Sequence, residues 1–258
     1  MNNDLRLKIV QMICSSGEGH IPSSFSIIDI INYLYENILK YKPNKKNWTE
    51  RDYFILSKGH GAAALYVVLN KFGFISDKQI KSYGKYNSIL GGHPDMTKVP
   101  GVEASTGSLG HGFPTAVGVA LGLKIKNKNN KIFTLLGDGE CHEGTIWESA
   151  NVAANLCLGN ICAIIDYNGS AKQLMPIDDM VAKWKAFGWD TFLCDGHSKK
   201  SLNRAFHKIS FFLKGKPKAI IARTIKGKGV NFLEGHGMWH HKIPNEYELE
   251  KIIKELKN

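Results

Sequence analysis

Two apolar runs near the middle of the chain predict buried strands. Residues 131–136 and 160–166 are rich in strand-forming side chains, and each run ends at glycine or polar residues. Between them, residues 143–156 carry apolar side chains at helical spacing, so a helix is expected over that range. A short crossover of this kind joins parallel strands that usually lie side by side. The pattern therefore predicts a strand, a helix and a parallel neighbouring strand.

The same alternation of elements extends to other parts of the chain. Residues 51–57 and 219–222 predict two more strands, residues 62–72 a helix, and residues 245–256 an amphipathic helix. With 258 residues, 43% of them hydrophobic, the chain can bury a full core, and no change in composition marks a linker. We expect an α/β fold with a doubly wound, mostly parallel sheet flanked by helices, forming a single domain over residues 1–258.

Polar side chains follow the two central strands at the point where each strand ends. Asp138, within Gly137-Asp138-Gly139, follows the first strand, and Asn168 follows the second. Because the carboxyl ends of adjacent parallel strands share one edge, both side chains should face the same small volume. Carboxylate and amide oxygens suit a hard cation such as Mg²⁺, and the backbone carbonyl of Ser170 is a third candidate ligand.

An anionic group is expected beside this cation. The helix that begins near Glu143 points free N–H groups toward the same edge, and Gly137 and Gly139 let the backbone come close to a bound group. Together these segments predict a magnesium-bound diphosphate. The alternative is that Gly-Asp-Gly forms only a tight turn, which leaves the matching position of Asn168 unexplained.

Histidines recur at glycine turns, where an imidazole can face a cleft. The motif at residues 57–61 follows the strand at 51–57, so His60 is expected at the same edge as Asp138. Six histidines directly follow a glycine: His20, His60, His93, His111, His197 and His236.

These motifs carry a resemblance to a known family. Gly137-Asp138-Gly139 with Asn168 resembles the thiamine diphosphate motif, and residues 57–61 (SKGHG), 91–94 (GGHP) and 105–110 (STGSLG) resemble transketolases in particular. The resemblance runs from about residue 13 to residue 244 and covers nearly the whole chain. It implies the thiamine diphosphate-binding fold, with the diphosphate-binding (PP-type) domain in this chain. The implied cofactors are thiamine diphosphate and Mg²⁺, for which Ca²⁺ or Mn²⁺ could substitute.

The resemblance also implies roles for the histidines. His60 would contact the cofactor diphosphate, His93 would face the reacting thiazolium carbon, and His20 would contact substrate hydroxyls. A late histidine that faces the cofactor is expected before Pro244, where His240 is favoured and His236 is the rival.

Further cofactor contacts follow from the same resemblance. Gly107 and Leu109 match positions that receive the aminopyrimidine ring, Glu143 matches a carboxylate that couples cofactor sites across a subunit interface, and Asp166 matches an acidic residue near the cofactor. Two departures from the family pattern affect the substrate pocket. Ile21-Pro22 stands where Pro-Gly is usual, and His111 stands where glutamine is common.

Transketolases need a second domain whose glutamate activates the pyrimidine ring, and no region of this sequence supplies it. After Pro244 only the short amphipathic helix is expected. The chain is therefore interpreted as the N-terminal subunit of a split transketolase, active with a separate pyrimidine-binding and C-terminal subunit, in an α2β2 heterotetramer. The reaction implied is transfer of a two-carbon ketol unit from a ketose, or ketose phosphate, to an aldose or aldose phosphate.

Three related alternatives stay open. The chain could be a subunit of a deoxyxylulose-phosphate synthase or of a 2-oxo acid dehydrogenase, although the motifs at 91–94 and 105–110 favour transketolase. It could also serve an unusual sugar in specialised metabolism. The resemblance implies that most contacts to the donor phosphate lie on the missing half, so the sequence does not specify the sugar.

Bulk properties add little to this picture. The net charge of +11 comes from thinly spread lysines, which argues against a nucleic-acid partner. Five scattered cysteines without a Cys-x-x-Cys pair fit a reduced compartment, and the Cys141-His142 pair alone does not indicate zinc. The sequence shows neither a secretory signal nor an apolar run of membrane-spanning length, so a cytoplasmic location is expected.

Overall fold

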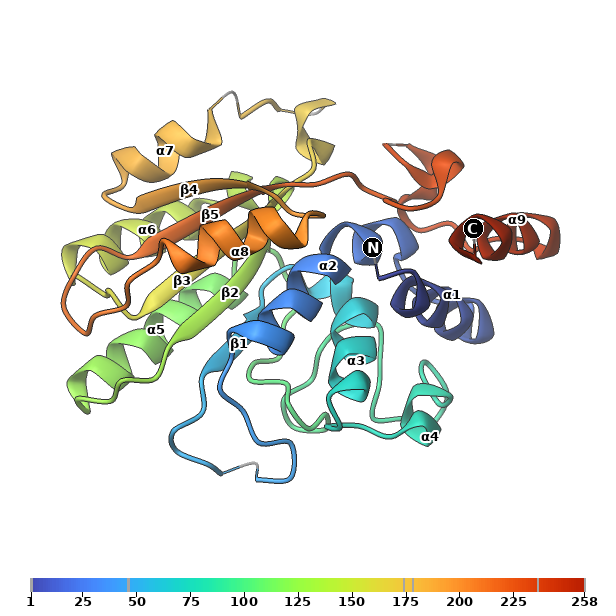
Figure 1. Ribbon diagram of the computed structural model, residues 1–258, viewed down its shortest axis with the longest axis horizontal. Coiled ribbons are helices and arrows are strands. Elements are labelled where there is room, and N and C mark those ends of the chain that lie inside the picture. The colour runs from blue at the N-terminus through green and yellow to red at the C-terminus, as the bar shows by residue number, and fades with distance from the viewer. Residues whose placement is uncertain (1, 46, 174, 178, 236, 258) are drawn as a thin grey trace.

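A parallel sheet of five strands, in the order β1-β2-β3-β5-β4, forms the centre of the molecule (Figure 1). The computed structural model describes residues 2–45, 47–173, 175–177, 179–235 and 237–257. The strands are β1 (Tyr53–Leu56), β2 (Ile132–Gly137), β3 (Ile161–Tyr167), β4 (Asp190–Asp195) and β5 (Lys218–Arg223).

Helices cover both faces of the sheet, which confirms the predicted α/β fold. One core joins a face of the sheet to α2 (Ile21–Asn37), α3 (Ala62–Lys71) and α8 (Lys199–His207), with α1 (Asn3–Ser16) and α9 (Glu246–Lys257) packed outside them. The opposite core lies beneath α5 (Gly112–Ile125), α6 (Gly144–Asn155) and α7 (Met180–Ala186). The remaining helical turns are α4 (Asp77–Ile80), η1 (Gly59–Gly61), η2 (Gly139–His142), η3 (Ser170–Gln173), η4 (Asn231–Leu233) and η5 (Met238–His240).

The unbroken apolar runs in the sequence follow from this two-sided burial. In β2, Phe133 and Leu135 belong to one core while Ile132 and Leu136 belong to the other. A strand covered on both faces needs apolar side chains at every position, so it shows no polar alternation.

The sheet register brings the predicted strand ends together. Gly137 at the end of β2 pairs with Asp166 near the end of β3, in parallel neighbouring strands as expected. The connections that leave β1 and β5 lead to the α2 and α3 side, whereas those that leave β2 and β3 lead to the α6 and α7 side. Ligands of such sheets bind where neighbouring connections part in this way, outside the carboxyl ends of the strands.

The elements predicted from periodicity are confirmed to within about two residues. The helix expected at 143–156 is α6, that at 62–72 is α3 and that at 245–256 is α9. The strand β4 and the helices α1, α2, α4, α5, α7 and α8 were not predicted from the sequence. No helix within the described ranges is both long enough and apolar enough to span a bilayer.

Close backbone packing beneath η1 generates a test of the fold. A Cβ atom on Gly59 would lie 2.7 Å from the backbone nitrogen of Gly107 and 2.9 Å from its Cα, so Gly59→Ala should force the two loops apart. We expect the free energy of unfolding to fall by about 1–3 kcal/mol, measured by urea denaturation.

A control is available in α5, where a Cβ on the exposed Gly118 would have no heavy atom within 4 Å. Gly118→Ala should therefore raise stability by about 0.5–1 kcal/mol. Equal effects of the two substitutions would contradict the close packing at Gly59.

Candidate functional site

Charged side chains from four strand ends converge on the carboxyl edge of the sheet. Lys58 follows β1, Asp138 follows β2, Asp166 lies near the end of β3, and Lys226 follows β5. All four are nearly inaccessible to solvent, with exposures of 3%, 4%, 0% and 8% respectively. Two carboxylates and two ammonium groups thus share a region of low dielectric, where their charges interact strongly.

Backbone N–H groups hold Asp138 across the gap between β2 and β3. Its carboxylate accepts hydrogen bonds from the N–H of Gly139 (2.8 Å) and the N–H of Gly169 (2.6 Å). Burial raises the pKa of the Asp138 carboxyl, and the nearby Asp166 raises it further. A cation beside Asp138 would oppose both effects, so the position favours a metal ion.

The turn after β3 carries the other two predicted metal ligands. The Oδ1 atom of Asn168 accepts the backbone N–H of Ser170 (2.9 Å), and its Nδ2 atom donates to Asp166 (3.0 Å). An amide oxygen has two lone pairs, so Asn168 can offer one to a metal while it caps this turn. The structure thus brings Asp138, Asn168 and Ser170 onto one hydrogen-bonded junction, since Gly169 bonds Asp138. Their role as ligands stays a prediction.

The buried carboxylate of Asp166 accepts hydrogen bonds from several segments at this edge of the sheet. Its carboxylate pairs with the Lys58 ammonium at 2.5 Å and accepts hydrogen bonds from Ser26 on α2, from Asn168 and from Thr224 after β5. Lys58 in turn donates to the carbonyl of Ser23 (3.2 Å). Asp166 therefore organises the strand ends beneath the site, and its direct contact with a cofactor stays a prediction.

Three of the predicted catalytic histidines form one cluster. The ring centroids of His20 and His60 are 5.4 Å apart, those of His20 and His240 are 5.0 Å apart, and those of His60 and His240 are 5.9 Å apart. His241 also approaches His20, at 4.7 Å. The structure thus places His240 in the cluster, while its rival His236 lies outside the described residues, so the choice between them stays a prediction.

The histidine cluster is held in its uncharged form. Burial lowers the pKa of His60 to about 2, with a further contribution from Lys58, and burial together with Lys226 lowers the pKa of His240 to about 4. Burial also lowers the pKa of His20, although a hydrogen bond to the carbonyl of His240 opposes the shift. Near neutral pH these imidazoles can therefore accept or donate single hydrogen bonds without carrying charge.

His93 lies on the exposed side of the same region. Its carbonyl accepts the Tyr66 hydroxyl (2.8 Å), and its ring covers Gly107, where a Cβ atom would come within 3.2 Å of the imidazole. Thr106 fastens the Gly107 turn to the end of β1 through a 2.7 Å bond to the carbonyl of Leu56. The structure thus brings His93 and Gly107 together, and their contacts with the thiazolium and aminopyrimidine rings stay predictions.

Leu109 and Glu143 lie at the rim of the site. The Leu109 side chain is 36% exposed, and Glu143 is exposed at the position before α6. Both are accessible for contact with a partner, but the interface role of Glu143 stays a prediction. His111, one of the departures from the family pattern, is exposed beside them and its Nδ1 atom lies 2.9 Å from the carbonyl oxygen of Leu109.

Glu140 is a site residue that reading the sequence missed. Its buried carboxylate accepts hydrogen bonds from the Ser57 hydroxyl, from the N–H of Gly110 (3.1 Å) and from the N–H of Gly137 (3.2 Å). It therefore ties the end of β1, the end of β2 and the 107–110 turn to one another. The acidic residue directly after Gly-Asp-Gly was the signal that could have found it.

Lys58 and Lys226 were also missed as site residues. Lys58 stands inside the SKGHG motif, and Lys226 stands in the glycine-rich segment after β5. Burial lowers the pKa of the Lys226 ammonium, as does the nearby Lys58. Two cations at a strand edge suit an anionic ligand, and a lysine within each glycine motif was the available signal.

The carboxyl edge of the sheet thus combines oxygen atoms that can bind a metal with lysine and histidine side chains that can bind an anion. Among the residues that the structure describes, no three His, Cys, Asp or Glu side chains are arranged to hold a metal. A metal here would therefore rely on Asp138, on neutral oxygens such as that of Asn168, and on oxygens of a bound ligand. This composition is typical of Mg²⁺ bound through a phosphate group.

The fold and this edge define an α/β protein built to bind a phosphorylated cofactor, and comparison with known proteins specifies the family. Residues 1–256 match the family described as "Transketolase, thiamine diphosphate binding domain". The chain belongs to the transketolase family, whose members are transferases.

Relatives of similar length are known. The chain is 38% identical over 256 residues to an apulose-4-phosphate transketolase subunit of Phocaeicola vulgatus, covering 97% of this chain and 90% of that protein. It is 36% identical over 259 residues to the 6-deoxy-6-sulfo-D-fructose transketolase subunit SqwG of Clostridium sp. strain MSTE9, covering 98% and 94% respectively.

Solved structures share the fold. The transketolase of Campylobacter jejuni superposes with a TM-score of 0.92 at 29% identity, over 99% of this chain. The chain spans only 42% of that protein's length. The comparison therefore covers one part of a longer polypeptide.

The lowered histidine pKa values predict a pH-dependent stability. Unfolded histidines take up a proton near pH 6.5, whereas His60 in the folded chain does not until about pH 2. Lowering the pH from about 7.5 to about 5 should therefore decrease the free energy of unfolding. In His60→Gln this decrease should be smaller by about 2 kcal/mol. Urea denaturation at several pH values between about 7.5 and about 5 measures the free energy of unfolding. The exposed His207 provides the control, and a His207→Gln variant that flattened the profile equally would contradict the assignment.

The three bonds to Glu140 predict a second effect. In Glu140→Gln an amide NH₂ replaces one carboxylate oxygen and faces the backbone N–H of either Gly110 or Gly137, donor against donor. The free energy of unfolding should therefore fall by about 1–3 kcal/mol. The exposed Glu143, which caps no N–H group of α6, is the matched control, and Glu143→Gln should change stability by less than about 0.5 kcal/mol. Indistinguishable midpoints for the two variants in urea would rule out the bridging role.

Proposed function

We propose that the chain is the diphosphate-binding subunit of a two-component transketolase, which works with a separate pyrimidine-binding subunit. The observation that carries this proposal is the junction at which the buried Asp138 reaches the Asn168 turn, beside the neutral histidine cluster. Two relatives matched over 90% and 94% of their length are themselves named as transketolase subunits, which supports the division into components.

The cofactor proposed for this edge is thiamine diphosphate with Mg²⁺. Asp138, Asn168 and the carbonyl of Ser170 would hold the metal, while His60 and Lys226 would contact the diphosphate. Gly107 and Leu109 would receive the aminopyrimidine ring. When bound, the cofactor supplies the carbanion chemistry that cleaves and forms carbon–carbon bonds.

The residues of the chain would orient the substrate and move protons. His20 donates from Nδ1 to the carbonyl of His240 (2.9 Å), which leaves its Nε2 atom free to accept a proton from a substrate hydroxyl. His93 stands over the Gly107 turn and would stabilise charge that develops near the reacting carbon. The buried edge excludes water from the charged groups, which strengthens these interactions.

The substrate class proposed is a ketose donor and an aldose acceptor, in free or phosphorylated form. Relatives of similar length are named for apulose 4-phosphate and for 6-deoxy-6-sulfo-D-fructose, so subunits of this type serve unusual sugars. An α2β2 assembly and a cytoplasmic location remain predictions from the sequence, and the single domain over residues 1–258 is proposed with them.

The proposed metal site predicts the effect of Asp138→Asn. Removing the buried charge while keeping the shape should weaken binding of thiamine diphosphate with Mg²⁺ about 100-fold or more, because a charged ligand is lost. Calorimetry of the chain mixed with its partner subunit measures the affinity, and ketol transfer should appear only in the mixture.

The control for that experiment is Asp190→Asn, which removes an exposed carboxylate at the opposite end of the sheet. The affinity of this variant for thiamine diphosphate with Mg²⁺ should equal that of the unmodified chain. Unchanged affinity in the Asp138 variant, or ketol transfer by the chain without a partner, would refute the proposal.

A further inference from the structure

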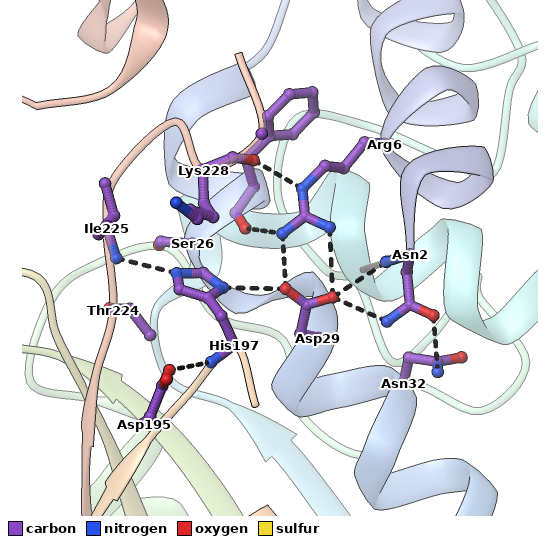
Figure 2. A network of polar contacts seen from close by, with 12 residues as sticks. Asn2, Arg6, Ser26, Asp29, Asn32, Asp195, His197, Thr224, Ile225 and Lys228 are labelled. Carbon is purple, nitrogen blue, oxygen red and sulfur yellow. Dashed lines mark hydrogen bonds and ion pairs between the residues drawn. The ribbon is translucent and has the colours of Figure 1, made fainter. Parts of the chain in front are cut away.

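A buried ion pair joins α1 to α2 beside the site (Figure 2). The guanidinium of Arg6 is fully buried and bonds both carboxylate oxygens of Asp29, at 3.2 and 2.6 Å. The same guanidinium donates to the carbonyl of Phe25 (3.2 Å) and to the carbonyl of Lys228 (2.7 Å). Arg6 thus reaches from α1 to the loop after β5.

His197 connects this ion pair to the other end of the same loop. Its Nδ1 atom lies 2.9 Å from the Asp29 carboxylate, and its Nε2 atom lies 2.9 Å from the backbone nitrogen of Ile225 (Figure 2). A backbone N–H can only donate, so Nε2 must be the acceptor and the proton must sit on Nδ1. His197 is therefore neutral and held in a single tautomer.

The charge on Asp29 is balanced without a charged histidine. Burial alone would raise the pKa of this carboxyl, but hydrogen bonds from His197 and Arg6 outweigh burial and lower it. The carboxylate is ionised and Arg6 neutralises it, and every nitrogen of the guanidinium donates to an acceptor. We call Arg6, Asp29 and His197 the loop clamp.

The loop held by this clamp presents Lys226 to the histidine cluster. His197 holds the N–H of Ile225, Arg6 holds the carbonyl of Lys228, and the N–H of Gly227 donates to the carbonyl of Pro22 (3.0 Å). Between these points, the Lys226 ammonium lies 3.0 Å from Nδ1 of His240. An ammonium group has no acceptor, so this Nδ1 atom must be unprotonated and the proton of the neutral ring must sit on Nε2.

We propose that His197 is a positioning residue: with Arg6 and Asp29 it fixes the loop at 225–228 so that Lys226 holds His240 in the tautomer with its proton on Nε2. The inference rests on the proposed function, because it explains how the late catalytic histidine is oriented. A role limited to joining helices would leave the tautomer of His240 unchanged when His197 is lost.

The first test removes both hydrogen bonds of His197. In His197→Leu, the amide of Ile225 should exchange with deuterium about tenfold faster, because its acceptor is gone. His197→Gln keeps one donor and one acceptor at similar separation and should restore slow exchange. His207→Leu, which changes an exposed histidine of α8, should exchange at the original rate.

The second test reads His240 directly, by ¹⁵N spectroscopy of histidine-labelled full-length chain. In the unmodified protein His240 should show the Nε2–H tautomer, and His197→Leu should convert it to a mixture while His197→Gln preserves it. Lys226→Met should give the same mixture, and it tests the inference even where the leucine variant fails to fold. An unchanged His240 tautomer in either Lys226→Met or folded His197→Leu would overturn the proposal.

Neither readout requires the partner or the cofactor, so failure of the proposed function is distinguishable. In the assembled enzyme, His197→Leu should lower kcat about tenfold with little change in KM, and glutamine should restore it. Unchanged kcat in a variant with an altered His240 would overturn the link to catalysis. Absence of ketol transfer in a mixture of the unmodified chain, its partner subunit and the cofactor would instead refute the proposed function. The tautomer of His240 would still show whether the loop clamp orients that residue.

Discussion

The buried ion pair between Lys58 and Asp166 is the contact on which the carboxyl edge of the sheet depends. Both groups are almost fully removed from water, and such desolvation is tolerated only when geometry and further hydrogen bonds are good. Asp166 meets that requirement with bonds from α2, from the turn after β3 and from the segment after β5. One ion pair therefore locks the ends of β1, β3 and β5 to a helix.

Among the residues that the structure describes, Asp138 forms no ion pair with a lysine or arginine of its own. Lys58 is engaged by Asp166, and Lys226 is engaged by His240, so the hydrogen bonds to the Asp138 carboxylate within the described residues come from two backbone N–H groups. Burial and the neighbouring carboxylate both oppose its ionisation. A divalent ion bound with a diphosphate would complete the balance, because it adds positive charge at Asp138 while the phosphates accept from the lysines and histidines around it.

The sequence predicts the centre of the fold well and its periphery less well. The strands β2 and β3 were readable because both faces are covered and the runs are unbroken. The helix α2 was not, because it is buried on nearly every side and its polar residues lie inside the protein instead of facing solvent. The edge strand β4 is half-exposed and shows no clean apolar run. Periodicity identifies an element only where its two sides meet different surroundings.

The candidate site shows the same division. Residues that carry a motif, such as Asp138, Asn168 and His60, could be named from order and spacing, and the structure brings them to one edge. Glu140 could not, because its importance arises from bonds to three separate segments that only the fold brings together. His197 could not be named for the same reason, because it acts through a loop whose path the sequence does not reveal.

The most direct measurement is an anomalous difference map from crystals of the chain with its partner subunit, thiamine diphosphate and Mn²⁺ in place of Mg²⁺. The account predicts one strong peak within about 2.0–2.3 Å of an Asp138 carboxylate oxygen and of Asn168 Oδ1, with diphosphate oxygens completing the shell. A map in which the metal and diphosphate lie elsewhere, with Asp138 still bound only to backbone N–H groups, would contradict it.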